Sequence, residues 1–303
     1  MSQFSIEPNN IPTTRNTLAQ LPVVSGPWRD AWRAFRHNKM AFVGLSIIIF
    51  FVIIALIAPW IAPFDYKEQN LVSRLQPPSA EHWFGTDDLG RDLLTRTLYG
   101  ARISLWVGFL SVIGSMIVGT ALGLIAGFYG KWADMIISRL FDILLAFPGI
   151  LLAIAIVAIL GPSLENALYA IAIVNVPTYG RLVRSKVLSV KTEEYITSAR
   201  ALGANNRRII LRYILPNSLT PIIVQGTLGI GTAIIEAAAL GFLGLGAQPP
   251  EPEWGKMLSD SRQYIQNAPW TVIFPGISIM LTVLGFNLMG DGLRDVLDPR
   301  AKR

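Results

Sequence analysis

Long apolar runs limit the possible folds of this chain more than any other feature of its sequence. A membrane-spanning helix needs roughly 20 mostly apolar residues. Such runs, of which the fourth is the shortest and weakest, cover residues 41–61, 103–129, 136–160, 166–183, 219–245 and 272–289. We therefore expect an all-α integral membrane protein with six transmembrane helices.

The composition agrees with this class. Hydrophobic residues make up 52% and charged residues 15% of the 303 residues, which is too apolar for a soluble domain of this length. There are no cysteines, which excludes a disulfide framework and a cysteine metal site. A net charge of +6 would suggest nucleic acid as the partner of a soluble protein. Here the basic residues flank apolar runs, so we expect contact with membrane lipid and not with nucleic acid.

The positions of lysine and arginine predict the orientation in the membrane, because these residues gather in cytoplasmic segments. They are concentrated before the first run, at Arg15, Arg29, Arg33, Arg36 and Lys39, and after the fourth, at Arg181, Arg184, Lys186, Lys191, Arg200, Arg207, Arg208 and Arg212. We expect both termini in the cytoplasm. The first run is longer than a signal-peptide core, so we expect it to remain as an anchor.

The chain divides into five expected parts. They are a cytoplasmic N-terminal segment at 1–40, the first transmembrane helix at 41–62, an external loop at 63–102, a transmembrane core at 103–292 and a cytoplasmic tail at 293–303. In the first part, Trp28, Trp32 and Phe35 recur at helical spacing opposite arginines. That pattern favours an amphipathic helix on the inner leaflet over an ordinary solvated helix.

The external loop contains an acidic turn bracketed by Gly85 and Gly90. We expect Asp87 and Asp88 at the start of a helix that runs through Leu98, where the helix dipole favours negative charge. A calcium site is the alternative, but the spaced ligands and the closing glutamate of a calcium loop are missing. In the next run, Gly119, Gly123 and Gly127 recur every four residues and predict close helix packing, within the chain or against a partner subunit.

A polar, basic segment separates the fourth and fifth runs: TEEYITSARALGANNRRIILRYILPN, at residues 192–217. It predicts two short helices. We expect Thr192 to cap the first, and Gly203 to end it in a left-handed conformation. Leu215-Pro216 is expected to end the second, because the residue before a proline disfavours the helical region.

The first of these helices has the features of a docking element. Tyr195, Ala199 and Leu202 are expected on one face. Ser198 and Ala199 are small, so another surface can approach closely there. We expect this cytoplasmic segment, which we call the docking loop (residues 185–217), to receive a force from a soluble partner. The alternative is an ordinary juxtamembrane helical hairpin.

The sequence gives no support to an enzyme. It has no phosphate-binding G-x-x-x-x-G-K-[ST] loop, no H-E-x-x-H motif and no G-x-S-x-G turn. The polar residues inside the apolar runs mark either a transport path or interhelical hydrogen bonds, and for Glu236 we favour a water-filled face because a charge in lipid is costly. Besides a pair formed by Arg139 and Asp142, the candidates are Asn175, Gln225, Glu236 and Asn287.

The docking loop resembles the cytoplasmic loop of permease subunits of bacterial ABC importers. Their pattern is E-A-A, three residues, G, nine residues, I, one residue, L-P. The corresponding positions here are Thr197, Ser198, Ala199, Gly203, Tyr213, Leu215 and Pro216. Thr197, Ser198 and Tyr213 depart from the pattern, although Glu193 and Glu194 stand close to the acidic position. The resemblance implies that Glu194 and the matching positions contact an ATPase subunit.

Three longer segments resemble the C-type subunit of the dipeptide/oligopeptide permease family: FGTDDLGRDLLTRTLYGARISL, ALGFLGLGAQPPEPEWGKMLSD and FNLMGDGLRDVLDPR. The similarity extends from about Trp28 onward and implies a type I importer permease with the MetI-like fold. It implies a multi-pass protein of the bacterial inner membrane, with a homologous B-type permease as heterodimer partner. It also implies two cytoplasmic ATPase subunits and an external substrate-binding protein.

The resemblance implies import of small peptides, driven by ATP hydrolysis on the partner subunits. ATP and magnesium would bind there, with no cofactor on this chain. Importers of glutathione, nickel and antimicrobial peptides share this subunit type and remain alternatives. A proton-coupled secondary transporter using Glu236 as a relay would not need the docking loop. An intramembrane hydrolase would need a nucleophile and a base that the sequence does not offer.

Overall fold

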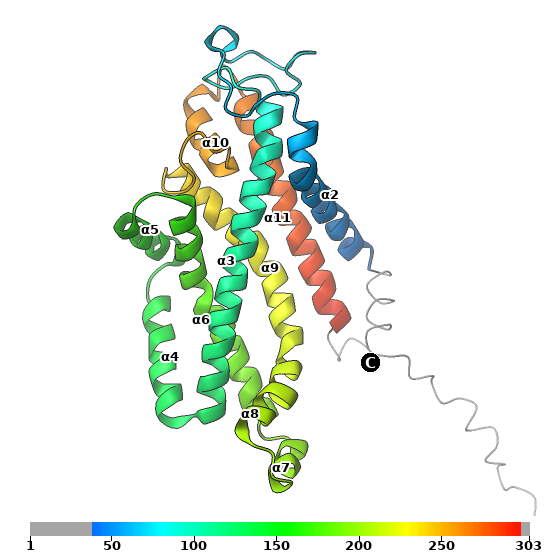
Figure 1. The fold of residues 1–303 in the computed structure, drawn as a ribbon, viewed down its shortest axis with the longest axis vertical. Helices are drawn as coiled ribbons and strands as arrows, with labels where there is room; N and C mark the ends of the chain where they lie inside the picture. The colour runs from blue at the N-terminus through cyan, green and yellow to red at the C-terminus, as the bar shows by residue number, and fades with distance from the viewer. Residues whose placement is uncertain (1–37, 298–303) are drawn as a thin grey trace, which may run out of the picture.

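The structure is a computed structural model that describes residues 38–297. This part of the chain is an elongated helical bundle (Figure 1). In chain order its helices are α2 (Lys39–Ile61), η2 (Leu71–Ser73), α3 (Leu93–Tyr129), α4 (Lys131–Leu145), α5 (Gly149–Leu160), α6 (Leu164–Val190), α7 (Glu194–Ala201), α8 (Asn206–Ile209), η3 (Ile210–Ile214), α9 (Leu215–Phe242), α10 (Trp254–Ser261), η4 (Arg262–Tyr264) and α11 (Trp270–Leu297). The expected interfacial helix around Trp28, and the tail from 298 onward, lie outside the described residues.

The apolar helices make this a membrane protein with several spans. Within residues 38–297, four are long and apolar enough to cross a bilayer, namely α2, α3, the continuous segment Asn206–Phe242 and α11. The expected third span is broken: α4 and α5 pass the same test only together and meet at a bend of 91°. Pro148, which stands directly before α5, explains the break because proline cannot donate a backbone hydrogen bond. The α6 helix has 27 residues but carries several charges in its second half.

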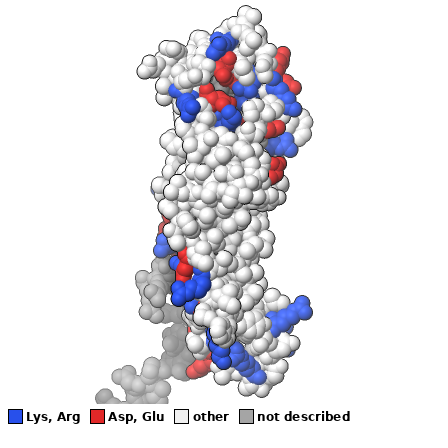
Figure 2. Space-filling view, turned by 90° about the vertical axis from the view of Figure 1, so that its left-hand side faces the viewer, with Lys and Arg blue, Asp and Glu red and all other residues white. Residues whose placement is uncertain are grey.

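Charged side chains gather toward the two ends of the molecule. On the face that Figure 2 shows, a belt without lysine, arginine, aspartate or glutamate separates them. One end carries α10 and the loop after α2, and the other carries α7 and α8 (Figure 1). We call them the α10 end and the α7 end. Exposed apolar side chains such as Leu56 on α2 and Ile117 on α3, at 66% and 62% exposure, suit a surface covered by lipid.

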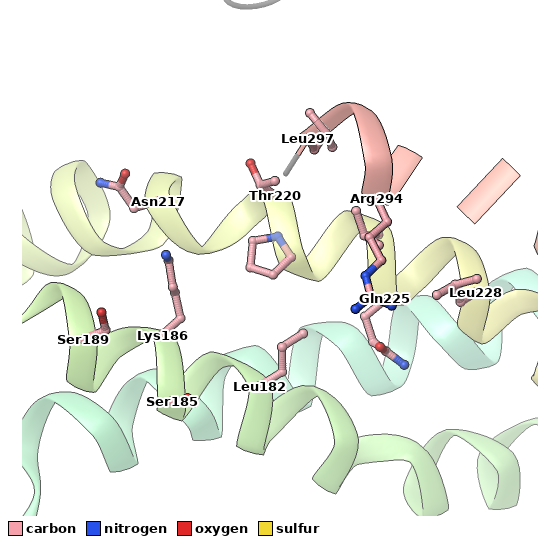
Figure 3. Close-up of a pocket in the computed structure, with 12 residues that line it drawn as sticks. Leu182, Ser185, Lys186, Ser189, Asn217, Thr220, Gln225, Leu228, Arg294 and Leu297 are labelled. Atoms are coloured by element: carbon pink, nitrogen blue, oxygen red, sulfur yellow. The ribbon is translucent and has the colours of Figure 1, made fainter. Parts of the chain in front are cut away.

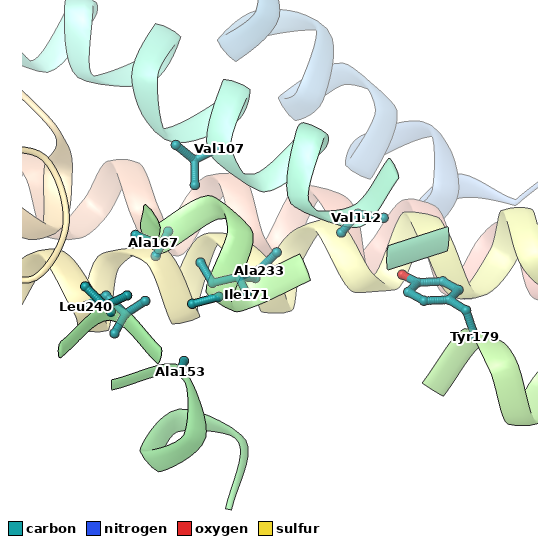
Figure 4. Packing of buried hydrophobic residues seen from close by; sticks show 11 residues of the cluster. Val107, Val112, Ala153, Ala167, Ile171, Tyr179, Ala233 and Leu240 are labelled. Atoms are coloured by element: carbon teal, nitrogen blue, oxygen red, sulfur yellow. The ribbon is translucent and has the colours of Figure 1, made fainter. Parts of the chain in front are cut away.

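The α3 helix is packed most tightly against α6. A Cβ atom on Gly119 would lie 2.6 Å from the Val176 carbonyl oxygen, and one on Gly123 would lie 2.5 Å from the Gly180 carbonyl oxygen. The glycine ridge therefore packs against α6 of the same chain and not against a partner subunit. Beside it, a buried apolar cluster joins α3, α5, α6 and α9 (Figure 4), and includes Val107, Val157, Ala167, Ile171, Tyr179, Ala233 and Leu240.

The expectation that Asp87 and Asp88 start a helix is wrong. The α3 helix begins at Leu93, and its N-cap is Asp92, which accepts the Thr95 N–H at 2.7 Å. Asp87 instead closes the preceding turn by accepting the N–H groups of Leu89 and Arg91, each at 2.9 Å. The turn itself has the expected glycines, since Gly85 and Gly90 have φ of +77° and +71°.

Buried ion pairs hold this turn against the start of α3. Arg91 Nε donates to Asp87 Oδ2 at 2.6 Å, and Arg96 Nε lies 3.5 Å from the same oxygen. His82 Nδ1 lies 2.9 Å from Asp92 Oδ1. Within residues 38–297, no group of three histidine or acidic side chains could hold a metal ion, so the structure offers the calcium alternative no site in that part of the chain.

A buried carboxylate caps the start of α10, and a buried tryptophan attaches this helix to α3. Glu253, between α9 and α10, accepts the N–H groups of Gly255 and Lys256, each at 2.8 Å. Burial raises the pKa of the Glu253 carboxyl, against the effect of these hydrogen bonds. The Trp254 indole donates to the Thr97 carbonyl at 3.0 Å and is fully buried. The α10 end is therefore built onto α3 as one packed unit.

Candidate functional site

The docking loop lies at the α7 end of the bundle (Figure 1). Gly203 has φ +83°, so the expected left-handed stop is confirmed. Its N–H donates to the Arg200 carbonyl at 2.9 Å, and the Ala204 N–H donates to the Ala199 carbonyl at 3.0 Å. These two bonds form a Schellman motif, which satisfies the last carbonyls of a helix. Gly203 therefore fixes where α7 ends.

The buried face of α7 is not the one that Tyr195, Ala199 and Leu202 would mark. Leu202 and Tyr195 are 89% and 43% exposed, whereas Ile196 and Ala199 are 1% and 8% exposed. The buried side of α7 therefore follows Ile196 and Ala199, which are three residues apart and share a helix face. Leu202 follows the end of α7, where the chain turns away into the left-handed Gly203.

The expected cap of α7 is also wrong. Glu193 is the N-cap residue, and it makes no side-chain hydrogen bond there. The Thr192 hydroxyl instead donates to the Ser189 carbonyl at 2.8 Å, so it serves the end of α6. The hydroxyl of a threonine one residue before a cap position can hydrogen-bond a backbone group of the preceding helix as well as one of the following helix. The sequence pattern did not distinguish these two uses.

Leu215-Pro216 does not end the second helix of the loop. The helical path continues from α8 through η3, a single π-helical turn, into α9, and Pro216 stands in the first turn of α9. The Leu215 N–H reaches back five residues to the Ile210 carbonyl. A π turn shifts the hydrogen-bond register, and it lies next to the position where proline offers no donor. The chain thus passes from the loop into a span without a break.

Contacts with α3 and α6 hold the docking loop in place. Lys191 Nζ donates to the Phe128 carbonyl at 2.6 Å, and the Arg200 guanidinium lies 5.7 Å from the centre of the Phe128 ring. Ile196 and Ile209 belong to one buried cluster with residues of α3, α6 and α9. The loop is therefore joined to the ends of those helices, so a push on α7 reaches them directly.

The resemblance-matched residues of the loop divide between surface and interior. Glu194, Thr197, Ser198, Gly203 and Pro216 are exposed, Leu215 is half-buried and Ala199 is buried. A Cβ atom on Gly203 would meet nothing within 4 Å. The outer face of α7 is therefore open to another molecule.

Two of the four polar candidates from the apolar runs meet in the structure. The Asn175 amide donates to Glu236 Oε2 at 2.9 Å, which joins α6 to α9. The same amide also donates to the Ile171 carbonyl at 3.0 Å. Both side chains are half-buried. The α6 helix runs without a break through both Asn175 and Pro177.

The other two candidates lie apart from this pair. Gln225 is half-buried and borders a cavity between α6, α9 and α11. Asn287 is exposed and sits beside α9, where a Cβ atom on Gly231 would lie 3.4 Å from its Oδ1. The predicted Arg139–Asp142 contact is present at 3.9 Å, but Asp142 lies closer to Arg181, at 2.6 Å.

Sequence reasoning missed the cavity that Gln225 borders. Its volume is about 730 Å³, and it lies toward the α7 end. Figure 3 shows Lys186 pointing from α6 into the space beside α9, and Arg294 pointing from α11 toward Gln225. No local signal could have found it, because its residues come from three helices far apart in the sequence. The lining residues are Leu182, Ser185, Lys186, Ser189, Asn217, Thr220, Pro221, Val224, Gln225, Leu228, Arg294 and Leu297.

Comparison with known families gives this geometry its context. Residues 119–303 match the model of the binding-protein-dependent transport system inner membrane component. The chain belongs to this permease family. Residues 26–78 also match the N-terminal TM domain of oligopeptide transport permease C.

Curated relatives of the permease cover almost its whole length. It is 67% identical to the dipeptide transport system permease protein DppC of Alkalihalophilus pseudofirmus, over 98% of this chain and 96% of that protein. It is 51% identical to the di/tripeptide transport system permease protein DppC of Pseudomonas aeruginosa, over 92% and 94%. It is 49% identical to the glutathione transport system permease protein GsiD of Pectobacterium atrosepticum, over 94% and 97%.

Solved structures show the same fold at low sequence identity. The inward-facing MetNI methionine ABC transporter has a chain with TM-score 0.54 and 22% identity, covering 68% of the permease and 98% of that chain. The permease is thus an all-helical, MetI-like subunit of an ABC importer in the bacterial inner membrane. It works in a complex whose ATPase activity lies in other subunits.

Proposed function

We propose that the permease carries dipeptides into the cytoplasm, driven by ATP hydrolysis on its partner subunits. The single observation that supports the substrate is the 67% identity, over nearly the full length, to a dipeptide transport permease. The relatives named for glutathione stand further away, at 49%.

Uptake in a strain lacking this permease tests the substrate. Labelled dialanine should enter cells that carry the permease with its partner subunits, and should not enter the deletion strain. Glutathione and Ni²⁺ serve as parallel substrates. Permease-dependent uptake of glutathione or Ni²⁺, without dialanine uptake, would replace the dipeptide proposal with that substrate. Uptake should survive collapse of the proton gradient as long as ATP is maintained, which separates an ABC importer from a proton-coupled transporter.

We further infer six membrane crossings with both termini in the cytoplasm. The bent α4–α5 pair would make one crossing and α6 another, in addition to the four apolar helices. An even number of crossings returns the chain to its starting side. The docking loop, with its concentration of arginine and lysine, then lies in the cytoplasm, as the positive-inside bias requires.

The docking loop is the proposed contact with an ATPase subunit. Glu194, Thr197 and Ser198 offer polar groups on its outer face, and Leu202 offers an apolar group at 89% exposure. An exposed apolar side chain among polar ones suits a protein interface. The second ATPase subunit would dock on a homologous B-type permease, the heterodimer partner. An external substrate-binding protein would dock at the α10 end.

The mechanism follows from the attachment of the loop. Closure of the ATPases on ATP would move α7, and the Arg200–Phe128 contact and the buried cluster around Ile196 would pass this movement to α3 and α6. The helices would rock and open the path to the outside, and hydrolysis would return them. Asn175 and Glu236 are proposed to border this path at the α6–α9 contact, and Gln225 to border it nearer the cytoplasm. Asn287 is proposed to be an interhelical polar contact.

A further inference from the structure

The cavity between α6, α9 and α11 extends beyond Gln225, the one lining residue that is proposed to border the path. Its volume of about 730 Å³ lies within the range of small-molecule sites, roughly 300–1,000 Å³. It is bordered by the second half of α6, the first half of α9 and the last turn of α11. These segments all belong to the α7 end, so the cavity opens near the docking loop.

The charge of the lining has one sign. Lys186 and Arg294 border the cavity, and no aspartate or glutamate among the described residues does. Neither cation forms a salt bridge within 4.0 Å to another side chain of residues 38–297, although such bridges hold Arg181 and Arg184 on the same helix. Asp295, the acidic neighbour of Arg294, accepts a hydrogen bond from Asn38 at 3.4 Å instead.

The remaining lining is suited to an organic anion. Ser185, Ser189 and Thr220 supply hydroxyl groups that can donate hydrogen bonds, and Gln225 supplies an amide. Leu182, Pro221, Val224 and Leu228 supply apolar surface beside them. Hydrogen bonds from charged donors to an oxyanion are among the strongest in proteins. A small molecule with a carboxylate and an apolar or small side chain satisfies both parts of the lining.

We propose that this cavity binds the C-terminal carboxylate of a transported peptide on the cytoplasmic side, with Lys186 and Arg294 supplying the positive charge. The inference rests on the proposed dipeptide import. The cavity then holds the peptide on the docking-loop side of the Asn175–Glu236 pair.

The site is separate from the Asn175–Glu236 pair. Gln225 and Glu236 stand about 16 Å apart along α9, at 1.5 Å per helical residue. A fully extended dipeptide spans at most about 7 Å. The lining residue nearest to Glu236 along α9 is Leu228, about 12 Å from it, so the cavity is a separate place closer to the cytoplasm.

Site-directed protection from a thiol reagent tests the proposal. The chain has no cysteine, so Ser189→Cys places one reactive thiol in this subunit at the cavity wall. The assembled complex is placed in phosphatidylcholine nanodiscs without nucleotide, and labelling of this chain by a maleimide is followed on a gel. Dialanine should slow the labelling. Dialanine amide, which lacks the carboxylate, should protect at least about threefold less well.

Variants in the same background assign the effect to the two cations. Lys186→Gln or Arg294→Gln should raise the dialanine concentration for half protection at least about threefold. Lys186→Arg, which keeps the positive charge, should leave that concentration near the wild-type value. Arg139→Gln is the matched control, since Arg139 lies on α4 with its side chain 79% exposed and does not border the cavity. Recovery of the ATPase subunits with each variant shows that the complex has assembled.

Three results would overturn the proposal. Equal protection by dialanine and its amide would exclude a carboxylate subsite. Protection that is unchanged in both cation variants would place the peptide elsewhere. Protection by phosphatidylglycerol in the nanodisc, with none by dialanine, would make the cavity a lipid headgroup site. Dialanine uptake by the wild-type complex is measured in parallel: normal uptake without protection refutes this inference alone, whereas absent uptake refutes the dipeptide substrate.

Discussion

Substitution of Gly203 separates backbone geometry from surface contact in the docking loop. With φ +83°, this residue occupies the left-handed region, and a Cβ atom there would meet nothing within 4 Å. A side chain therefore causes no clash inside the permease, and its cost is conformational. Four variants of graded cost are informative: Gly203→Asn, Gly203→Asp, Gly203→Ala and Gly203→Val.

The magnitude follows from the left-handed conformation. An ordinary side chain there costs about 1–2 kcal/mol, asparagine costs less, and a β-branched residue costs most. If the ATPase subunit binds only the loop with residue 203 in the left-handed conformation, a conformational cost of about 1 kcal/mol lowers the affinity of the ATPase for the permease roughly fivefold. We expect docking to fall in the order glycine, asparagine, alanine, valine. Aspartate has nearly the shape of asparagine, so any further loss with Gly203→Asp measures the effect of charge at the interface.

The assay is co-purification of the ATPase subunits with the variant permease, together with dipeptide-stimulated ATP hydrolysis and uptake of labelled dialanine. Membrane insertion and pairing with the B-type permease should stay normal, because the loop lies outside the spans. Wild-type docking and uptake in both Gly203→Ala and Gly203→Val would refute the reasoning. It would show that the left-handed turn is not needed for coupling.

Three further predictions concern the spans. A cysteine introduced by Ser79→Cys should react with an impermeant thiol reagent added outside spheroplasts, and one introduced by Ser189→Cys should not; labelling of the latter from outside would contradict the six-span topology. Glu236→Gln, which keeps shape and removes charge, should reduce dialanine uptake without loss of the assembled complex, and unaltered kinetics would show that the charge has no role. Gly123→Ala should lower the thermal stability of the purified complex, by about 1–3 kcal/mol of overpacking, because its Cβ would lie 2.5 Å from a carbonyl oxygen. The matched control Gly114→Ala should leave the thermal stability unchanged, because its Cβ would lie 3.5 Å from Ala172. Equal effects of the two variants would show that close packing at Gly123 does not stabilise the α3–α6 contact.

The helices were predictable because a span needs a length of apolar sequence, and local pattern carries that information. The glycine ridge and the left-handed Gly203 were predictable for a similar reason, since spacing or residue type alone points to them. The bend at Pro148 was not predicted, because an apolar run of the right length hides a break in direction. Pro177 shows the opposite case, since tertiary packing keeps α6 helical through a proline.

The site was less predictable than the fold. The buried side of α7 depends on which helices lie beneath it, and Ile196 is buried only because α3, α6 and α9 meet there. The Asn175–Glu236 bond joins residues 61 positions apart, so each was visible as a polar group but their contact was not. Arg184 and Asp134 form an ion pair across 50 positions, and the sequence offered no reason to join them.

The close packing of α3 against α6 has a consequence for the transport cycle. With backbone atoms in contact at Gly119 and Gly123, neither helix can slide or turn past the other without a clash. The two helices must therefore move together as one rigid unit. The proposed rocking then has to be accommodated where the chain changes direction beside this helix pair, at the 91° bend before α5. Stiffening this bend should slow the proposed transport cycle, although the bend lies outside the docking loop.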